Sequence, residues 1–475
     1  MKEDLLRVMV KGGALSPIDL RQIVETAESL GLSSILLGSR QDILLEYHEP
    51  IDNIARQLPN FNVEYVSNRT FQNIVSSYVS ADIFSATSWL NGATYLYILE
   101  QFQYLPKLEI NITDSRQRLV PLFTGQLNFI ASEQEDYWYL YLRFDGEDKV
   151  QQYPVWTHSW DIHSLCREIE KHWDSVKDAQ QLFELVNAAI ELNNRNISKP
   201  LQIPFIPFPY YEGMNRMGVE QYWLGLYWRN NQYDLAFLHA LADLCMESRI
   251  GKICLTPWKS LIIKGIPAED KILWEKLLGS YGINVRHSSL ELNWHLPVSN
   301  PDALELKRFL VRNFDQNDIS TYGLTFGIST GYSPFFTSIV IRKNPPPKVA
   351  QGYDIRPTFD VMYCEDFDPN NLNYQCYAQD VDKIELAGLL MELSRMYFSQ
   401  LGEKRPSTSA PVTTSEPIRE QIEINAFQCP DCMTVYDSRF GDEVVGIAAG
   451  TPFEQLPDDY CCGVCEAPKG AFLAV

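Results

Sequence analysis

The sequence predicts an α+β protein of several domains, with a large N-terminal region, a flexible linker and a small cysteine-rich module at the C-terminal end. Three observations predict this. The chain has 475 residues, more than one ordinary core serves, so two to four domains are expected. Strand-like and helix-like apolar patterns alternate through most of its length. A stretch rich in proline, serine and threonine then precedes two cysteine pairs.

The large region mixes strand and helix patterns. Apolar runs typical of strands occur at Ser34–Leu45, Trp138–Phe144 and Ile250–Ile263. Apolar residues at helical spacing occur at Asp19–Leu30, Tyr233–Met246 and Val381–Leu401. The aromatic runs YWYLYL at 137–142 and QYWLGLYW at 221–228 also look like strands. Their side chains are expected in a hydrophobic core rather than on a ligand platform.

The large region also contains an internal echo. The segment that starts at Asp19 can be aligned with the segment that starts at Asp234, and a three-residue insertion then places Ile35 opposite Ile253. Both copies show a helix, a strand, a polar dipeptide and another apolar run. The spacing of over 200 residues predicts two related α+β halves, at 1–200 and 201–401.

The linker is predicted from composition. Residues 403–417 contain three prolines and six serine or threonine residues but no aromatic residue. Such a stretch cannot bury apolar surface, so we expect a flexible tether at 402–422 before a module at 423–475. A tether of about twenty residues has a root-mean-square span of roughly 25 Å.

The overall charge excludes some classes of partner. Forty basic and 61 acidic residues give a formal charge of −21, which disfavours binding to nucleic acids and anionic membranes. No apolar run is long enough for a transmembrane helix, and no signal peptide is visible, so no membrane insertion and a cytoplasmic location are expected. The acidity suits a basic docking partner, or it simply maintains solubility.

Two Cys-x-x-Cys pairs in the module predict a metal site. They are separated by twenty-nine residues and consist of Cys429, Cys432, Cys462 and Cys465. Each pair presents two thiolates, and two pairs complete a tetrahedron that leaves no position for a substrate. The spacing alone permits either iron or zinc.

The module resembles rubredoxin over 427–472. The motifs are Cys-Pro-x-Cys at 429–432, Val-Tyr-Asp at 435–437, Gly-Asp at 441–442, Gly-Ile-x-x-Gly-Thr-Pro-Phe at 446–453, Leu-Pro-Asp-Asp-Tyr at 456–460 and Ala-Pro-Lys at 467–469. The resemblance implies one iron, Fe2+ or Fe3+, that passes single electrons. It also implies an aromatic core made of Phe427, Tyr436, Phe453, Tyr460 and Phe472.

The module departs from the usual rubredoxin pattern at several positions. Glycine usually follows the second and fourth cysteines, where this chain has Met433 and Glu466, and Gly463 replaces a usual proline. Cys461, beside Cys462, is expected to be a bystander thiol. The residues from 423 to 475 carry nine acidic and two basic side chains, a net charge of −7 that suits a basic redox partner.

The large region resembles the ferredoxin-like half-domains of sirohaem nitrite and sulfite reductases. The resemblance rests on LLGSRQDILL at 36–45 and CLTPWKSLII at 254–263. It implies that Arg40, and Lys259 opposite Gln41, lie where a sirohaem or an anion binds. Outside the cysteine-rich module, the chain has neither the Cys-x5-Cys pair nor the Cys-x3-Cys pair that hold the four-iron cluster of that family. Sirohaem and the cluster are therefore not expected, and no catalytic residue is predicted.

Three functions follow from these patterns. The first is an electron carrier rather than a catalytic reductase, in which a tethered rubredoxin is docked by a cofactor-poor scaffold. Its partners would be an electron-donating reductase and an acceptor oxidoreductase, and the resemblance suggests nitrite, nitrate or sulfite assimilation as the pathway. The alternatives are a divergent sirohaem reductase with its own rubredoxin and an interaction protein with a structural zinc.

Overall fold

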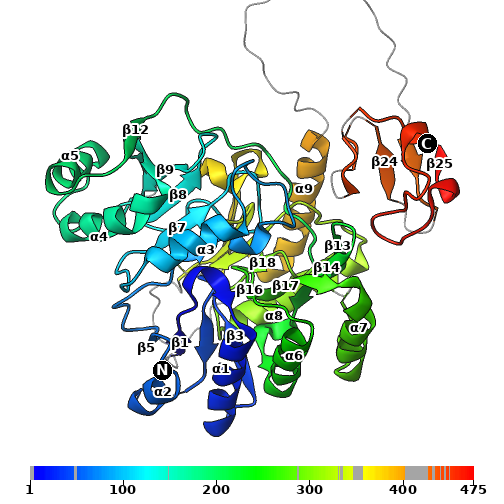
Figure 1. Cartoon of the computed structure of the whole chain (residues 1–475), viewed down its shortest axis with the longest axis horizontal. Coiled ribbons are helices and arrows are strands. Elements are labelled where there is room, and N and C mark those ends of the chain that lie inside the picture. The colour runs from blue at the N-terminus through cyan, green and yellow to red at the C-terminus, as the bar shows by residue number, and fades with distance from the viewer. Residues whose placement is uncertain are drawn as a thin grey trace, which may run out of the picture.

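The structure is a computed structural model, and its description covers most of the chain. The described residues are 5–47, 51–147, 149–285, 288–329, 331, 335–345, 357–401, 426–430, 434–438, 440–442, 445–448 and 450–474. They form four sheets in the large region and one small sheet in the C-terminal module (Figure 1). The predicted linker at 402–422 lies outside these ranges. None of the helices within them is long and apolar enough to cross a membrane.

Two small sheets exchange strands with each other. The first, in the order β15-β3-β4-β1-β5, consists of β1 (Leu6–Val8), β3 (Ser34–Leu37), β4 (Ile43–Leu45), β5 (Val63–Tyr65) and β15 (Tyr233–Asp234). The second, in the order β13-β14-β17-β16-β2, consists of β2 (Ala14–Leu15), β13 (Gly213–Met217), β14 (Gln221–Tyr227), β16 (Ile253–Leu255) and β17 (Ser260–Pro267). Each sheet therefore takes one edge strand from the other half of the sequence, which ties the halves together.

The internal echo is a structural repeat of a helix followed by a hairpin. Helix α1 (Pro17–Ser29) precedes β3 and β4, and helix α6 (Leu235–Glu247) precedes β16 and β17. The two helices pack side by side (Figure 1). The hairpin turns also match, because Gln41 and Lys259 both have a φ of 58°. The predicted duplication is confirmed.

The alignment of the two helices was wrong by three residues. Ser16 accepts a hydrogen bond from the Asp19 amide at 3.1 Å, and Asp234 accepts one from the Phe237 amide at 2.8 Å, so Ser16 and Asp234 are the equivalent N-caps. No insertion is needed, since α6 begins and ends 218 residues after α1. A shift of three residues is close to one helical turn, and the apolar pattern therefore does not detect it.

Two larger sheets repeat a second unit. The first, in the order β12-β11-β9-β8-β7-β6 with β10 beside β9, contains β6 (Val75–Ser76), β7 (Ile110–Thr113), β8 (Leu127–Ala131), β9 (Tyr137–Leu142), β10 (Gln151–Gln152), β11 (Val155–His158) and β12 (Asn194–Asn196). The second contains, in sheet order, β18 (Trp294–His295), β19 (Phe326–Ser329), β20 (Ile339–Lys343), β21 (Phe359–Cys364) and β22 (Tyr374–Val381). In both sheets, the first three strands along the chain are parallel: β6, β7 and β8 in the first sheet and β18, β19 and β20 in the second. The strands that follow them, β9 and β11 in the first sheet and β21 and β22 in the second, pair in antiparallel fashion.

Helices flank all of these sheets. Besides α1 and α6, they are α2 (Asp52–Gln57), α3 (Gly92–Gln101), α4 (Ile162–His172), α5 (Ala179–Ala189), α7 (Lys271–Ser280), α8 (Pro301–Gln316) and α9 (Lys383–Leu401). In each larger unit a helix, α3 or α8, joins the first two parallel strands, as a parallel crossover requires. The predicted division between 200 and 201 falls in the segment between β12 and β13, and it stays a prediction.

The aromatic runs are core strands, as predicted. Alternate residues of a strand face opposite sides of its sheet. In β9, Trp138 and Leu140 join the largest core on one side, whereas Tyr137 and Tyr139 join a second cluster on the other. The run QYWLGLYW forms β14 and the residue after it, with Leu224 fully buried. The buried residues of these two runs stabilise the fold by packing in its core.

Candidate metal centre

The C-terminal module is built around three short antiparallel strands. They lie in the order β24-β23-β25, with bounds of Ala426–Gln428 for β23, Val435–Asp437 for β24 and Leu473–Ala474 for β25. Cys429 directly follows β23. The second cysteine pair lies in a turn before β25, where Cys461 and Pro468 form an isolated bridge. The short sheet thus brings together two turns that are distant in the sequence.

The two cysteine turns have the same backbone geometry. The Cys429 amide donates to the Thr434 carbonyl at 2.8 Å, and the Cys462 amide donates to the Ala467 carbonyl at 2.8 Å. Both hydrogen bonds span five residues. The first cysteine of each pair therefore occupies an equivalent place in its turn, as expected when two turns share one metal.

Three cysteine sulfurs lie close together. The Sγ atoms of Cys429 and Cys465 are 3.4 Å apart, and with Cys462 all lie within 4.8 Å of one another. Sulfur atoms about 2.3 Å from a tetrahedral metal are about 3.8 Å apart, so this spacing fits a metal site. Cys429 and Cys462 are buried, whereas Cys465 is exposed. Cys432, the predicted fourth ligand, lies outside the described residues.

An aromatic core supports the cysteine turns. The rings of Phe427 and Phe453 stack with centroids 3.9 Å apart, and Tyr436 and Phe472 meet Phe453 at 5.7 and 5.5 Å. Tyr460 lies 5.8 Å from Tyr436 and donates a hydrogen bond to Asp442 at 3.0 Å. The five predicted aromatic residues therefore pack together. Their rings fill a core of which Cys429 and Cys462 are themselves members.

Comparison with known proteins identifies the module. The family model of rubredoxin matches residues 426–472. A probable rubredoxin, HupI, of Bradyrhizobium diazoefficiens is 42% identical over 59 residues, which are 12% of this chain and 86% of that protein. This chain belongs to the rubredoxin family. Rubredoxin-1 of Chlorobaculum tepidum is 38% identical over 61 residues, 13% of this chain and 87% of its own. Membership in the family implies iron bound by the clustered cysteines.

The rest of the chain is similar in fold to a solved structure. The NirA protein of Mycobacterium tuberculosis superposes with a TM-score of 0.63 at 16% identity, over 84% of each chain. At this identity the likeness shows the fold alone. Most of the chain therefore shares the fold of NirA.

One departure from the rubredoxin pattern has a clear backbone consequence. Glu466, which directly follows Cys465, has a φ of 63°, in the left-handed region that glycine adopts without strain. A side chain there costs about 1 kcal/mol. Met433, the other departure of this kind, lies outside the described residues. Cys461 is not among the three clustered sulfurs, and its role as a bystander stays a prediction.

Arg40 is occupied by contacts within the protein. Its guanidinium donates to the backbone carbonyls of Asn73 at 2.9 Å and Ile110 at 3.2 Å, and it lies 3.7 Å from the Glu109 carboxylate. Burial lowers the pKa of Arg40, while Glu109 opposes that shift. These contacts fasten the first hairpin to β7. The predicted role of Arg40 toward a sirohaem or an anion stays a prediction.

Lys259 occupies the matching turn of the second hairpin. It is 9% exposed, and its ammonium donates to the Leu296 carbonyl. Burial and, to a smaller extent, the charge of nearby Lys307 together lower the pKa of Lys259 to about 7. Lys307 in turn bonds the Tyr227 hydroxyl at 2.5 Å, and His295 also has a lowered pKa because of burial. The role of Lys259 toward an anion likewise stays a prediction.

The lowered pKa of Lys259 predicts a pH-dependent stability. In the unfolded chain Lys259 keeps its proton up to a pH near 10, whereas in the folded chain it releases the proton near pH 7. Burial of the charged ammonium therefore lowers the free energy of unfolding most below pH 7, and this destabilisation is lost as the pH rises from 7 to 10. We expect Lys259→Met to be more stable than the natural protein by about 1–2 kcal/mol near pH 6, because loss of the Leu296 hydrogen bond offsets part of the gain. The difference should shrink towards pH 10.

Urea unfolding at a series of pH values measures this difference. Lys276→Met, at an exposed lysine of α7, is the matched control. A difference between the natural protein and Lys259→Met that stays constant from pH 6 to 10 would contradict a buried, titrating ammonium.

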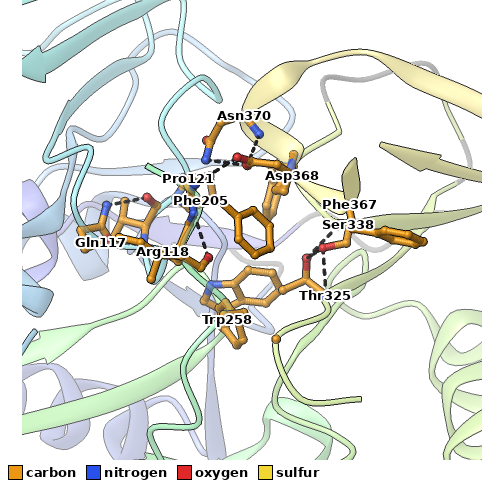
Figure 2. A pocket seen from close by; sticks show the side chains of 16 residues that line it. Gln117, Arg118, Pro121, Phe205, Trp258, Thr325, Ser338, Phe367, Asp368 and Asn370 are labelled. Atoms are coloured by element: carbon orange, nitrogen blue, oxygen red, sulfur yellow. Dashed lines mark hydrogen bonds and ion pairs between the residues drawn. The ribbon is translucent and has the colours of Figure 1, made fainter. Parts of the chain in front are cut away.

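A small cavity lies beside the second hairpin. Its volume is about 30 Å³, and its lining residues come from both halves of the large region. Figure 2 shows Phe205, Trp258 and the Arg118–Asp368 ion pair around it. That ion pair, at 3.0 Å, joins residues 250 positions apart, and sequence reasoning missed it because no local pattern marks either residue. The cavity has room for one or two water molecules.

Trp258 forms much of the wall of the cavity. It is 3% exposed, its indole nitrogen donates to the Leu119 carbonyl at 2.8 Å, and its ring lies 4.6 Å from that of Phe208. These contacts show that Trp258 serves packing. The Trp258 side chain fills the space beside the turn at Lys259 and packs the second hairpin against the first half of the large region.

Proposed function

We propose that this protein is an electron carrier, in which one iron held by Cys429, Cys432, Cys462 and Cys465 exchanges single electrons. The observation that carries the proposal is the cluster of three cysteine sulfurs in a rubredoxin module. Iron, when bound, supplies one-electron exchange between Fe2+ and Fe3+. The protein supplies thiolates, paired turn amides and an aromatic core, which hold the ligands in place and exclude water from one side.

The contacts in the large region support a scaffold rather than a sirohaem enzyme. Arg40 and Lys259, the basic residues expected near such a group, are both engaged by backbone carbonyls. The cavity that Trp258 lines beside the second hairpin is small, about 30 Å³. Among the described residues, the only group of three or more potential ligands close enough for a metal is the rubredoxin site.

The module is expected to work with two redox partners, an electron-donating reductase and an acceptor oxidoreductase. Its net charge of −7 suits basic docking faces on both. The resemblance of the large region to nitrite and sulfite reductases supports a place in nitrite, nitrate or sulfite assimilation. A divergent sirohaem reductase is the second candidate, favoured by the likeness in fold to NirA.

Metal analysis and a visible spectrum of the protein from its own host test the proposal. We expect one iron per chain, thiolate-to-iron bands that dithionite bleaches, and loss of all colour when 403–475 are deleted. Native expression matters because other hosts can load zinc into four-cysteine sites. Zinc in the native protein would favour a structural role. Tetrapyrrole bands that survive the deletion would establish the reductase alternative instead.

A further inference from the structure

Glu466 of the rubredoxin module contacts the large region through three side chains. Its carboxylate accepts a hydrogen bond from the Tyr222 hydroxyl at 2.8 Å. The same carboxylate lies 3.4 Å from the Lys271 ammonium and 3.5 Å from the Arg216 guanidinium. One acidic group thus meets two cations and a hydroxyl, at a position where rubredoxins usually have glycine.

The three partners form a small basic patch on the second half of the large region. Arg216 and Tyr222 lie directly opposite each other on β13 and β14. Lys271 begins α7, and its ammonium lies 4.8 Å from the centre of the Tyr222 ring. Arg216 is only 19% exposed and Lys271 32%, so both are partly held by their surroundings. The fold therefore assembles this patch from three separate elements.

The contact lies beside the iron ligands. Glu466 directly follows Cys465, and Arg216 also interacts with the Cys461 thiol, which directly precedes Cys462. The patch therefore holds the second cysteine turn from both ends. Cys465 nevertheless stays exposed, and Val464 beside it is 61% exposed.

We propose that the Arg216–Tyr222–Lys271 patch is the docking site for the iron-bearing second turn of the chain's own rubredoxin module. The occupant is identified by charge, since the module carries a net −7 and presents Glu466 to two cations. The left-handed backbone at Glu466 supports this assignment, because a strained non-glycine residue is retained where its side chain makes the contact. In the docked state the Cys465 edge of the iron site remains open to an external redox partner.

Docking gives the tether a defined end point. The module is held at the second half of the large region instead of sampling every position that the linker allows. An electron donor or acceptor would then meet the open Cys465 edge beside the surface of the large region. The purpose of the docking rests on the proposed function, although the contact itself does not require iron to change its oxidation state.

A zero-length carbodiimide crosslink followed by mass spectrometry tests the contact in the full-length protein. The reagent joins carboxylates to amines that touch, so we expect a Glu466–Lys271 crosslink at low salt. The Glu133–Lys199 pair, 3.3 Å apart within the large region, provides the internal standard. At about 1 M salt, where the Debye length is about 3 Å, the Glu466–Lys271 yield should fall relative to that standard.

Charge reversal at Arg216 changes the patch without removing either crosslinked group. In Arg216→Glu we expect the Glu466–Lys271 yield to fall by at least about threefold, because attraction becomes repulsion. Arg308→Glu makes the same charge change at an exposed position on α8 and should leave the yield unchanged. The Glu133–Lys199 crosslink shows whether each variant is folded.

The outcomes separate docking from electron transfer. Absence of the Glu466–Lys271 crosslink, or a yield that Arg216→Glu does not alter, would overturn the docking site. Iron content and bleaching by dithionite, measured on the same samples, test the proposed function independently. A colourless protein with the crosslink would keep the docking site and refute the electron carrier.

Discussion

Replacement of Cys462 by serine is expected to abolish the iron site. Cys462 is fully buried in the core of the rubredoxin module, and its sulfur belongs to the cluster with Cys429 and Cys465. Even residues that only support a ligand weaken metal binding by about 10–100-fold when they are changed, and loss of a ligand should exceed that effect. We expect the visible thiolate bands and the bound iron to disappear in Cys462→Ser.

The adjacent Cys461 provides a control of the same chemistry. Cys461 pairs with Pro468 through the backbone and is not part of the sulfur cluster. Cys461→Ser should therefore keep one iron per chain and its spectrum. Metal analysis of both variants after native expression makes the comparison. Retention of iron in Cys462→Ser together with its loss in Cys461→Ser would move the ligand assignment by one residue.

The second large effect is expected at Trp258. This side chain is almost fully buried between the halves of the large region and contacts Phe208 and Phe336. Removal of its ring leaves a cavity and an unpaired carbonyl at Leu119. We expect Trp258→Ala to lower the free energy of unfolding of the large region by about 3–5 kcal/mol. Urea unfolding followed by circular dichroism measures the change.

Two comparisons make the Trp258 result specific. Trp160 is 58% exposed, so Trp160→Ala should change the free energy of unfolding by less than about 1 kcal/mol. The rubredoxin bands of Trp258→Ala should stay unchanged, because that module has its own aromatic core. Equal destabilisation by the two tryptophan replacements would contradict the assignment of Trp258 as a buried residue that helps to join the halves.

The rubredoxin module was predictable because its information is local. Two short cysteine motifs, together with the turn and aromatic residues around them, specify both the predicted ligands and the small core. The clustering of Cys429, Cys462 and Cys465 and the stacking of Phe427 on Phe453 follow that pattern. Family membership then implies iron, which the spacing of the cysteines alone left open against zinc.

The duplication of the large region was only partly predictable. Periodicity located the helices and strands of the echo, but it placed Asp19 opposite Asp234 instead of Ser16. A helix repeats its apolar face about every turn, so hydrophobic pattern cannot fix an alignment to better than three or four residues. The hydrogen bonds of the N-caps fixed it, together with the matching turns at Gln41 and Lys259.

By itself, the sequence predicted four cysteine ligands and determined the family of the module and the mixed, doubled character of the large region. Only the tertiary structure decided what the charged side chains contact. It placed Arg40 and Lys259 against backbone carbonyls, paired Arg118 with Asp368, and set Arg216 and Lys271 around Glu466. The physical reason is the separation of the interacting residues along the sequence. A turn motif consists of a few neighbouring residues and can be recognised from them. An ion pair between residues about 200 positions apart depends on how the sheets pack, and no local sequence pattern predicts it.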